Sequence, residues 1–352
     1  MAETKNIWDD INEIEIDDSW RKHHSQEYIQ YREKFKKAQS QQYLGDFPLS
    51  LEIEATYHCN LECPYCPRAA NIGERDEKHM PQKTWDMIVN EIKANKLSSI
   101  LMDHEAESLV NKNFFNMLSD VKAAGVFDIW LHSNANILTP KISEQLIDGG
   151  ITKINFSIDA ATKKTYEKLR VGGKFERVLK NVDNFLRLKK EKQAKHIRTR
   201  VSFVVMPENK NEMKDFFEYW KVKEGINLIT FQNCEDFSFF EKPDGDELLS
   251  QSDLHEKYEK EEPFYCSMPW EMPVIDVEGN IVPCGVPIRE HSKKFVLGNL
   301  NNGDNIKSCW QGAAMKNLRE IHKSGKWYLN DMCRVCVKQR RLNQTDSTVM
   351  VS

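Results

Sequence analysis

The chain has 352 residues, 40% of them hydrophobic, and a formal net charge of −4. This length favours one large domain with a smaller one, and the charge does not favour a general binder of nucleic acid or of membrane surfaces. No apolar run approaches the ~20 residues that a membrane helix needs, and the acidic start of the chain has no apolar signal core. We therefore expect a cytoplasmic protein, in which clustered cysteines are more often ligands or redox groups than disulfides.

Residues 1–47 are polar and predict an N-terminal helical extension that ends near Gly45. From residue 48 to residue 240, apolar strand-like segments alternate with helical ones. The expected strands lie in LSLEIEAT, SSILM, DIWLHSN, KINFSID, TRVSFVVM and NLITFQN. Six strands separated by helices predict an α/β fold, a partial (β/α)6 TIM-like barrel, with the functional groups on the loops after the strands.

The last third of the chain differs in composition from the segment of alternating strands and helices. Residues 241–263 are charged and punctuated by Pro and Gly, which predicts a linker. Residues 264–352 hold five of the nine cysteines and are expected to form a small α+β domain. Within it, VIDVEGNIVPC predicts a β-hairpin that turns at EGN and ends at Cys284.

The stretch YHCNLECPYC places Cys59, Cys63 and Cys66 directly after the first expected strand. A structural zinc ion takes four ligands, and a 4Fe–4S cluster usually takes four thiolates. No fourth cysteine is near, and His58 would point away from Cys59 on an extended chain. The spacing favours a cluster with one iron left for a non-protein ligand, with a three-cysteine zinc or structural site as the alternative.

This Cys-x3-Cys-x2-Cys pattern, with Tyr65 before its last cysteine, resembles the radical S-adenosylmethionine (radical SAM) superfamily, and the likeness extends over about residues 45–340. The resemblance implies that the amino and carboxylate groups of S-adenosylmethionine chelate the free iron. Reductive cleavage then gives a 5′-deoxyadenosyl radical, which abstracts hydrogen from a C–H bond. A flavodoxin or ferredoxin is the expected electron donor.

The resemblance also assigns cofactor contacts. In DHEAESLV, Glu107 takes the place of the Glu in the family's Gly-Gly-Glu-Pro and would meet the ammonium group, although Ala106 and Ser108 depart from that motif. HSNANIL resembles the family's Thr-Asn-Gly segment, and FSIDAATKKTYEKLRVGG resembles its Ser-Ile-Asp segment with a downstream Arg. An Arg suits the cofactor carboxylate. The implied cofactor-binding residues are Tyr65, Glu107, Ser133, Asn134, Ser157, Arg170, Val205 and Met206.

A second cysteine set lies in the C-terminal part. From the residues alone, Cys266, Cys284, Cys333 and Cys336 could bind either zinc or an iron–sulfur cluster. The segment resembles the single-cluster "twitch" form of the SPASM domain, which implies one auxiliary 4Fe–4S cluster. Cys309 is expected to be a buried thiol outside the cluster.

Four further residues are candidate catalytic groups. Cys234 follows the sixth strand, where it is either a hydrogen-atom donor or a small buried side chain, and Asp236 could be a base or a substrate ligand. His104 and Glu105 stand near Glu107 and are acid–base candidates, with ordinary loop polarity as the alternative.

The expected function is oxidation of an alcohol to a carbonyl on a small polar substrate, carbohydrate- or aminocyclitol-like, with the auxiliary cluster as electron acceptor. Epimerisation with Cys234 as hydrogen donor is the first alternative. Modification of a ribosomal peptide is another, disfavoured because residues 1–47 are too short and polar for a peptide-recognition domain. A zinc-stabilised or metal-storing binding protein is the non-enzyme alternative.

Overall fold

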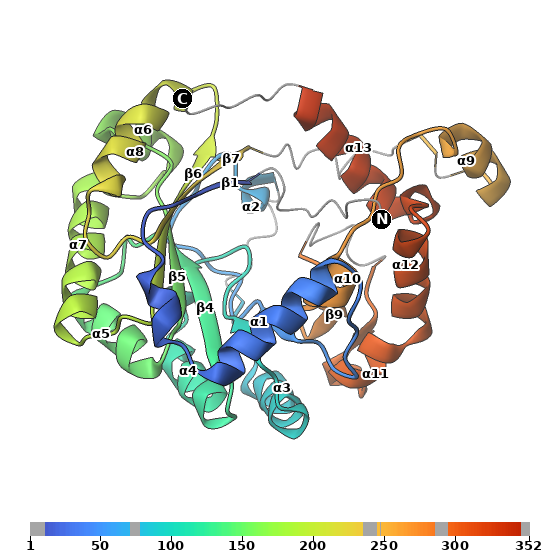
Figure 1. The fold of residues 1–352 in the computed structure, drawn as a ribbon, viewed down its shortest axis with the longest axis horizontal. Helices are drawn as coiled ribbons and strands as arrows, with labels where there is room; N and C mark the ends of the chain where they lie inside the picture. The colour runs from blue at the N-terminus through green and yellow to red at the C-terminus, as the bar shows by residue number, and fades with distance from the viewer. Residues whose placement is uncertain (1–10, 71–77, 235–244, 247, 286–294, 346–352) are drawn as a thin grey trace.

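The computed structural model describes residues 11–70, 78–234, 245–246, 248–285 and 295–345. Its centre is one sheet of ten strands in the order β1-β7-β6-β5-β4-β3-β2-β8-β9-β10. Six consecutive members run parallel and curve into an open barrel (Figure 1). These are β2 (Ser50–Ile53), β3 (Ser99–Leu101), β4 (Asp128–Ser133), β5 (Lys153–Ser157), β6 (Arg198–Val205) and β7 (Leu228–Asn233). The predicted partial (β/α)6 barrel is confirmed, with every strand in its expected segment.

Helices cover the outer face of the barrel strands (Figure 1). They are α3 (Gln82–Asn95), α4 (Phe114–Ala123), α5 (Pro140–Gly149), α6 (Lys163–Leu169), α7 (Phe175–Glu191) and α8 (Met213–Lys221). In α5 the Thr139 side chain caps the first turn, Pro140 opens the helix and Gly150 ends it at a φ of 87°. Its buried side chains include Leu146 and Ile147, which join the main core.

The N-terminal extension differs from the prediction because it contains a strand as well as helix. α1 (Gln26–Gln39) is helical as expected, but β1 (Ile11–Glu15) pairs antiparallel with β7. The sequence INEIEI supports a strand, and this pairing covers an edge that β7 would otherwise leave open. Among residues 11–47, the structure therefore combines this strand with the helix α1.

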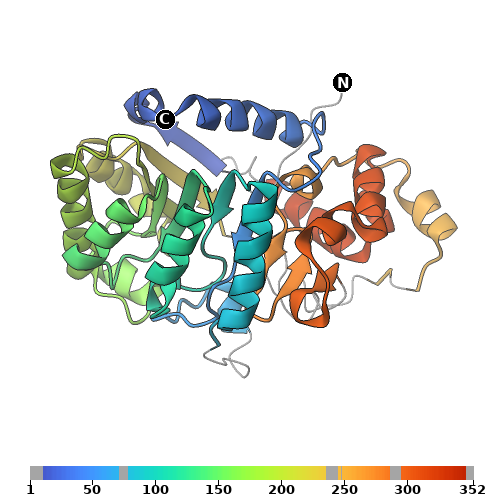
Figure 2. The ribbon, with the colours of Figure 1, turned by 90° about the horizontal axis from the view of Figure 1, so that it is seen from below.

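α1 lies across one end of the barrel (Figure 2). Tyr31 packs edge-on against Phe127, the residue before β4, with ring centroids 5.9 Å apart. Lys153, the first residue of β5, lies 5.7 Å from the centre of the Tyr28 ring. Both contacts are at the amino-terminal ends of strands, so α1 closes the end of the barrel opposite the cysteine loop.

The C-terminal part continues the same sheet. β8 (Val274–Ile275) pairs parallel with β2, and β9 (Asn280–Val282) and β10 (Gly298–Asn299) follow antiparallel. The predicted hairpin is therefore present, and its turn uses Gly279 at a φ of 81°. The helices of this part are α10 (Met268–Glu271), α11 (Ile306–Gln311), α12 (Ala313–Lys323) and α13 (Asp331–Thr345).

The segment expected to be a linker contains α9 (Gln251–Tyr258). Tyr258 stacks on Tyr328 with ring centroids 5.5 Å apart, so this helix packs on the C-terminal part. Within the residues that the structure describes, no helix combines the length and apolarity needed to cross a bilayer.

Candidate functional site

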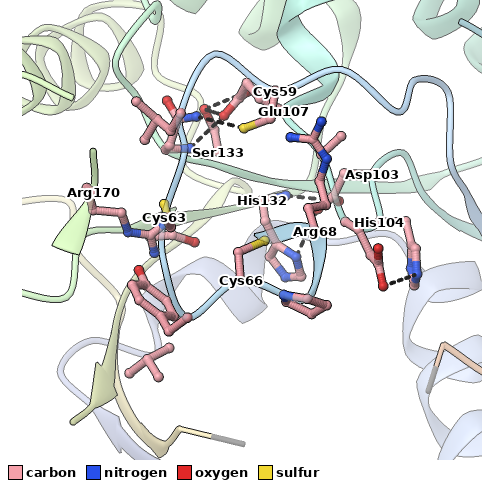
Figure 3. Close-up of a pocket in the computed structure, with 18 of the residues that line it drawn as sticks. Cys59, Cys63, Cys66, Arg68, Asp103, His104, Glu107, His132, Ser133 and Arg170 are labelled. Atoms are coloured by element: carbon pink, nitrogen blue, oxygen red, sulfur yellow. Dashed lines mark hydrogen bonds and ion pairs between the residues drawn. The ribbon is translucent and has the colours of Figure 1, made fainter. Parts of the chain in front are cut away.

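A cavity of about 280 Å³ opens at the carboxyl ends of the barrel strands. Figure 3 shows Cys59, Cys63 and Cys66 along one loop, with Arg170 and His104 on opposite sides. The cavity gathers twelve of the residues predicted from sequence: Cys59, Cys63, Tyr65, Cys66, His104, Glu105, Glu107, Ser133, Asn134, Ser157, Arg170 and Cys234.

Two of the predicted cofactor-binding residues, Val205 and Met206, are not among the lining residues. Val204 lines the cavity, whereas Val205 and Met206 do not. Successive residues of a strand point to opposite faces, so Val205 packs against the core instead. Met206 is 6% exposed. Asp236, the remaining candidate, lies outside the described residues.

The cysteine loop is tied to the segment that follows β5. The Tyr65 hydroxyl donates a 2.5 Å hydrogen bond to Oδ2 of Asp159, and the Glu62 backbone N–H donates to the Val171 carbonyl at 2.9 Å. The Cys66 N–H donates to the Cys63 carbonyl at 3.1 Å, which closes a turn between two of the cysteines. Hydrogen bonds within the protein therefore fix the conformation of the cysteine loop.

The thiols of this loop are buried together. Burial, followed by Glu105 and the other two thiols, raises the pKa of Cys66 to about 12. Burial also raises the pKa of Cys59. A buried thiolate is stable only beside a positive charge, and a metal centre supplies that charge.

Hydrogen bonds fix the buried Glu107 carboxylate in the wall of the cavity. It is 2% exposed, and one of its oxygens accepts a 2.7 Å hydrogen bond from the Asn134 backbone N–H. Ser133 donates its hydroxyl to the same carboxyl group at 3.1 Å. Burial raises the pKa of Glu107 to about 7. Because a neighbouring ammonium would favour the charged form, the site suits the amino group that the resemblance assigns to it.

Arg170 is already paired inside the protein. Its guanidinium forms a buried ion pair with Asp159, and its Nη1 lies 3.9 Å from the Cys63 sulfur. Asn134 has a similar place beside Cys59, with its amide nitrogen 3.9 Å from that sulfur. Asp159 was missed as a functional residue, although it stands within the quoted SID motif. Its burial and its partners could not be read from that motif.

A second group of ionisable residues spans β2 and the loop after β3. His104 Nδ1 hydrogen-bonds to the Glu52 carboxylate, and His104 Nε2 lies 3.9 Å from Glu105 Oε1. Burial would lower the pKa of His104, but Glu52 outweighs it and raises the value to about 10. Burial raises the pKa of Glu105 to about 8. Glu52 was missed because its strand was read only for its apolar positions.

His132 and Asp103 also line the cavity and were missed. His132 Nδ1 lies 3.0 Å from Asp103 Oδ2, and its Nε2 lies 3.3 Å from a guanidinium nitrogen of Arg200. These residues come from the end of β4, the loop after β3 and β6. No spacing rule within one strand predicts such a contact between strands.

The second cysteine set converges at a separate pocket of about 30 Å³. Burial, and then the three other thiols, raise the pKa of Cys333 well above its ordinary value. Cys333 and Cys336 lie in the first turns of α13, and Cys284 follows β9. The pocket is lined by Phe264, Cys266, Met268, Cys284, Phe295, His322, Met332, Cys333, Cys336 and Val337.

The donor sets of both sites fit iron–sulfur clusters. Within the described residues, no three His, Cys, Asp or Glu side chains are arranged to hold a single metal ion. A cuboidal cluster distributes its thiolates over several irons, so its ligands do not surround one point. None of the nine cysteines, all described, is in a disulfide. Cys309 is buried as expected, with its sulfur 3.6 Å from the Leu297 carbonyl.

The comparison with protein families agrees with both sites. Residues 53–219 match the radical SAM superfamily, and residues 266–337 match the iron–sulfur cluster-binding domain called SPASM. The chain belongs to the radical SAM superfamily and carries a SPASM domain. A radical SAM domain implies S-adenosylmethionine and a 4Fe–4S cluster, and a SPASM domain implies additional iron–sulfur clusters.

Individual relatives are distant. A probable GTP 3′,8-cyclase of Methanocaldococcus jannaschii is 27% identical over 174 residues, which cover 48% of this chain and 54% of the cyclase. The chain thus spans about half the length of such relatives. The mycofactocin maturase of Mycolicibacterium smegmatis is 20% identical over 80% of this chain and 74% of its own. The structure of native anSMEcpe with bound AdoMet has a TM-score of 0.57 at 17% identity, covering 81% of this chain and 88% of that one.

Proposed function

We propose that the chain oxidises an alcohol of a small polar substrate, carbohydrate- or aminocyclitol-like, to a carbonyl. When bound at Cys59, Cys63 and Cys66, the cluster and S-adenosylmethionine would supply a radical able to remove a hydrogen atom from a carbon. The Glu107 carboxylate would bind the ammonium group of the cofactor, and the Ser133 hydroxyl would orient the Glu107 side chain. The barrel carries these side chains on strand ends that its outer helices keep in place.

After the hydrogen atom has left a CH–OH group, one proton and one electron must follow to leave C=O. Glu105 lines the cavity and is our candidate acceptor for the proton. Because burial raises the pKa of Glu105 to about 8, its carboxylate is a stronger base than an ordinary glutamate, and the fraction able to accept the proton grows as the pH rises through about 8. The Cys266, Cys284, Cys333 and Cys336 pocket would hold the electron acceptor.

The observation that carries this proposal is the position of the Glu52–His104 pair. A Cβ on Gly285 would lie 3.0 Å from Oε2 of Glu52 and 3.4 Å from the His104 ring. Gly285 follows Cys284 directly, and His104 lines the substrate-side cavity. A buried acid–base pair therefore lies between the cavity and the backbone beside an auxiliary cysteine, on the side of the cavity from which the electron would leave.

The test uses anaerobically reconstituted protein, a chemical reductant and a panel of aminocyclitols and sugars deuterated at their carbinol carbons. We expect deuterium in 5′-deoxyadenosine and a product that lacks two hydrogens. The Cys333→Ala, Cys336→Ala double variant should still release 5′-deoxyadenosine but form no carbonyl. Carbonyl formation by that variant, or the absence of any such product across the panel, would refute the proposal.

Epimerisation is the second candidate, and it is supported by the place of Cys234 on the cavity wall. A thiol there could return a hydrogen atom to the substrate radical. In deuterated water, an epimerase would yield product with one deuterium at the inverted carbon, and Cys234→Ala would abolish it. The likeness to a maturase over most of the chain makes a precursor peptide the third substrate class to assay.

A further inference from the structure

One imidazole stands between two of the auxiliary cysteines. His322 of α12 is 2% exposed, and its Nε2 lies 3.3 Å from the Cys333 sulfur. Its Nδ1 accepts a 3.3 Å hydrogen bond from the backbone N–H of Cys266. The ring therefore contacts residues from both ends of the auxiliary domain.

The contact with Cys266 favours the tautomer with the ring hydrogen on Nε2, because a nitrogen that accepts a hydrogen bond has no hydrogen of its own. The ring also hydrogen-bonds with the backbone of Phe264. Nε2 faces the Cys333 sulfur, and a metal-bound sulfur can only accept. The bond therefore runs from the imidazole to the sulfur.

The surroundings make this bond electrostatically effective. Apart from the cysteines and His322, the pocket lining consists of apolar side chains. A hydrogen bond in such surroundings is stronger than one exposed to water. Reduction adds negative charge to a cluster and its sulfurs, so a donor at one sulfur stabilises the reduced form more than the oxidised form.

We propose that His322 is a positioning residue that raises the reduction potential of the auxiliary cluster through an Nε2–H bond to the Cys333 sulfur. The inference rests on the proposed presence of that cluster, and it makes the cluster a better acceptor of the electron removed from the substrate. His322 transfers no proton in this role. It sets the potential and fixes the side chain of one ligand.

The test isolates the auxiliary cluster. In a background with Cys59, Cys63 and Cys66 replaced by Ala, only the auxiliary site should bind iron, about four per chain. A redox titration followed by electron paramagnetic resonance then gives one midpoint potential. We expect His322→Leu to lower this potential. His322→Gln keeps an N–H donor, so its potential should lie between those of His322→Leu and the parent. Ile321→Val, a buried change on the same helix, should leave it unchanged.

A second readout does not depend on the size of the shift. The reduced parent should show an exchangeable proton coupled to the cluster, and this signal should be absent in His322→Leu. If His322→Leu loses its iron, the Gln variant decides, because it should retain both the cluster and an exchangeable proton. An unchanged potential in His322→Leu, or a Gln variant without the proton, overturns the inference. A background protein that binds no iron overturns the auxiliary cluster itself, so the two failures are distinguishable.

Discussion

The hydroxyl of Tyr65 donates a 2.5 Å hydrogen bond to Asp159, and this bond links the cysteine loop to the end of β5. Asp159 is fully buried and has a φ of 62°. Its other carboxylate oxygen accepts from the Val204 N–H at 2.7 Å, and Arg170 pairs with the oxygen that Tyr65 contacts. One carboxylate thereby positions the cysteine loop, a cation beside Cys63 and the end of β6.

Replacement of Tyr65 by Phe should loosen the loop while leaving Asp159 paired with Arg170. A hydrogen bond to a charged group contributes about 1.5–3 kcal/mol, so we expect a measurable loss of stability and weaker retention of the first cluster. Asp159→Asn should cost more, because it leaves the buried Arg170 charge without a counter-charge. Iron released to a chelator over time measures the effect. Equal release from wild type and Tyr65→Phe would contradict it.

The sequence predicted the barrel well because each strand carries its own apolar pattern between helices. It also predicted most cavity residues, since loops after parallel strands meet at one edge of the sheet. The pairing of β1 with β7 was missed because it joins residues about two hundred positions apart. Asp103 and His132 were missed for the same reason, since their partners lie on other strands or loops, whereas the strand of Glu52 was read only for its apolar positions. Local patterns carry no information about such contacts.

Replacement of Cys59, Cys63 and Cys66 by Ala should abolish cleavage of S-adenosylmethionine. The reconstituted wild type should hold about eight irons per chain and the triple variant about four, at about four per cubane. The matched control is Cys309→Ala, because this buried thiol lies outside both cysteine sets. Release of 5′-deoxyadenosine and total iron are the measurements. Cleavage retained by the triple variant would refute the assignment of the first site.

Glu107→Gln should weaken the binding of S-adenosylmethionine with little change in iron content. The substitution keeps the shape of the side chain but removes the charge that would meet the ammonium group. A charge-assisted hydrogen bond of about 1.5–3 kcal/mol corresponds to about 10–150-fold in affinity. Glu208→Gln, at a carboxylate 42% exposed beside Lys168, is the control. Binding measured by calorimetry on the anaerobic protein should separate the two variants, and equal affinities would exclude Glu107 as the ammonium contact.

Glu105 should make the stability of the metal-free protein depend on pH. Burial raises its pKa from an ordinary value of 4.5 to about 8, with Glu54 and Glu52 adding to the rise while His104 and Arg68 oppose it. The folded state therefore binds this proton more tightly than the unfolded state. Its contribution to the free energy of unfolding is full below about pH 4.5 and is lost as the pH rises through about 8.

The contribution of His104 to stability is also lost as the pH rises, between about pH 6.5 and about pH 10, because its pKa is raised from 6.5 to about 10. Between about pH 5 and about pH 8, Glu105 should therefore remove at most about 1.4 kcal/mol per pH unit from the free energy of unfolding of the metal-free wild type. Glu105→Gln cannot ionise, so over that range its urea midpoint should fall less, or rise more, than that of wild type. Unfolding curves at about pH 5.5 and about pH 8 compare the two proteins. A variant whose midpoint falls as far as that of wild type would show that Glu105 is not the buried acid responsible.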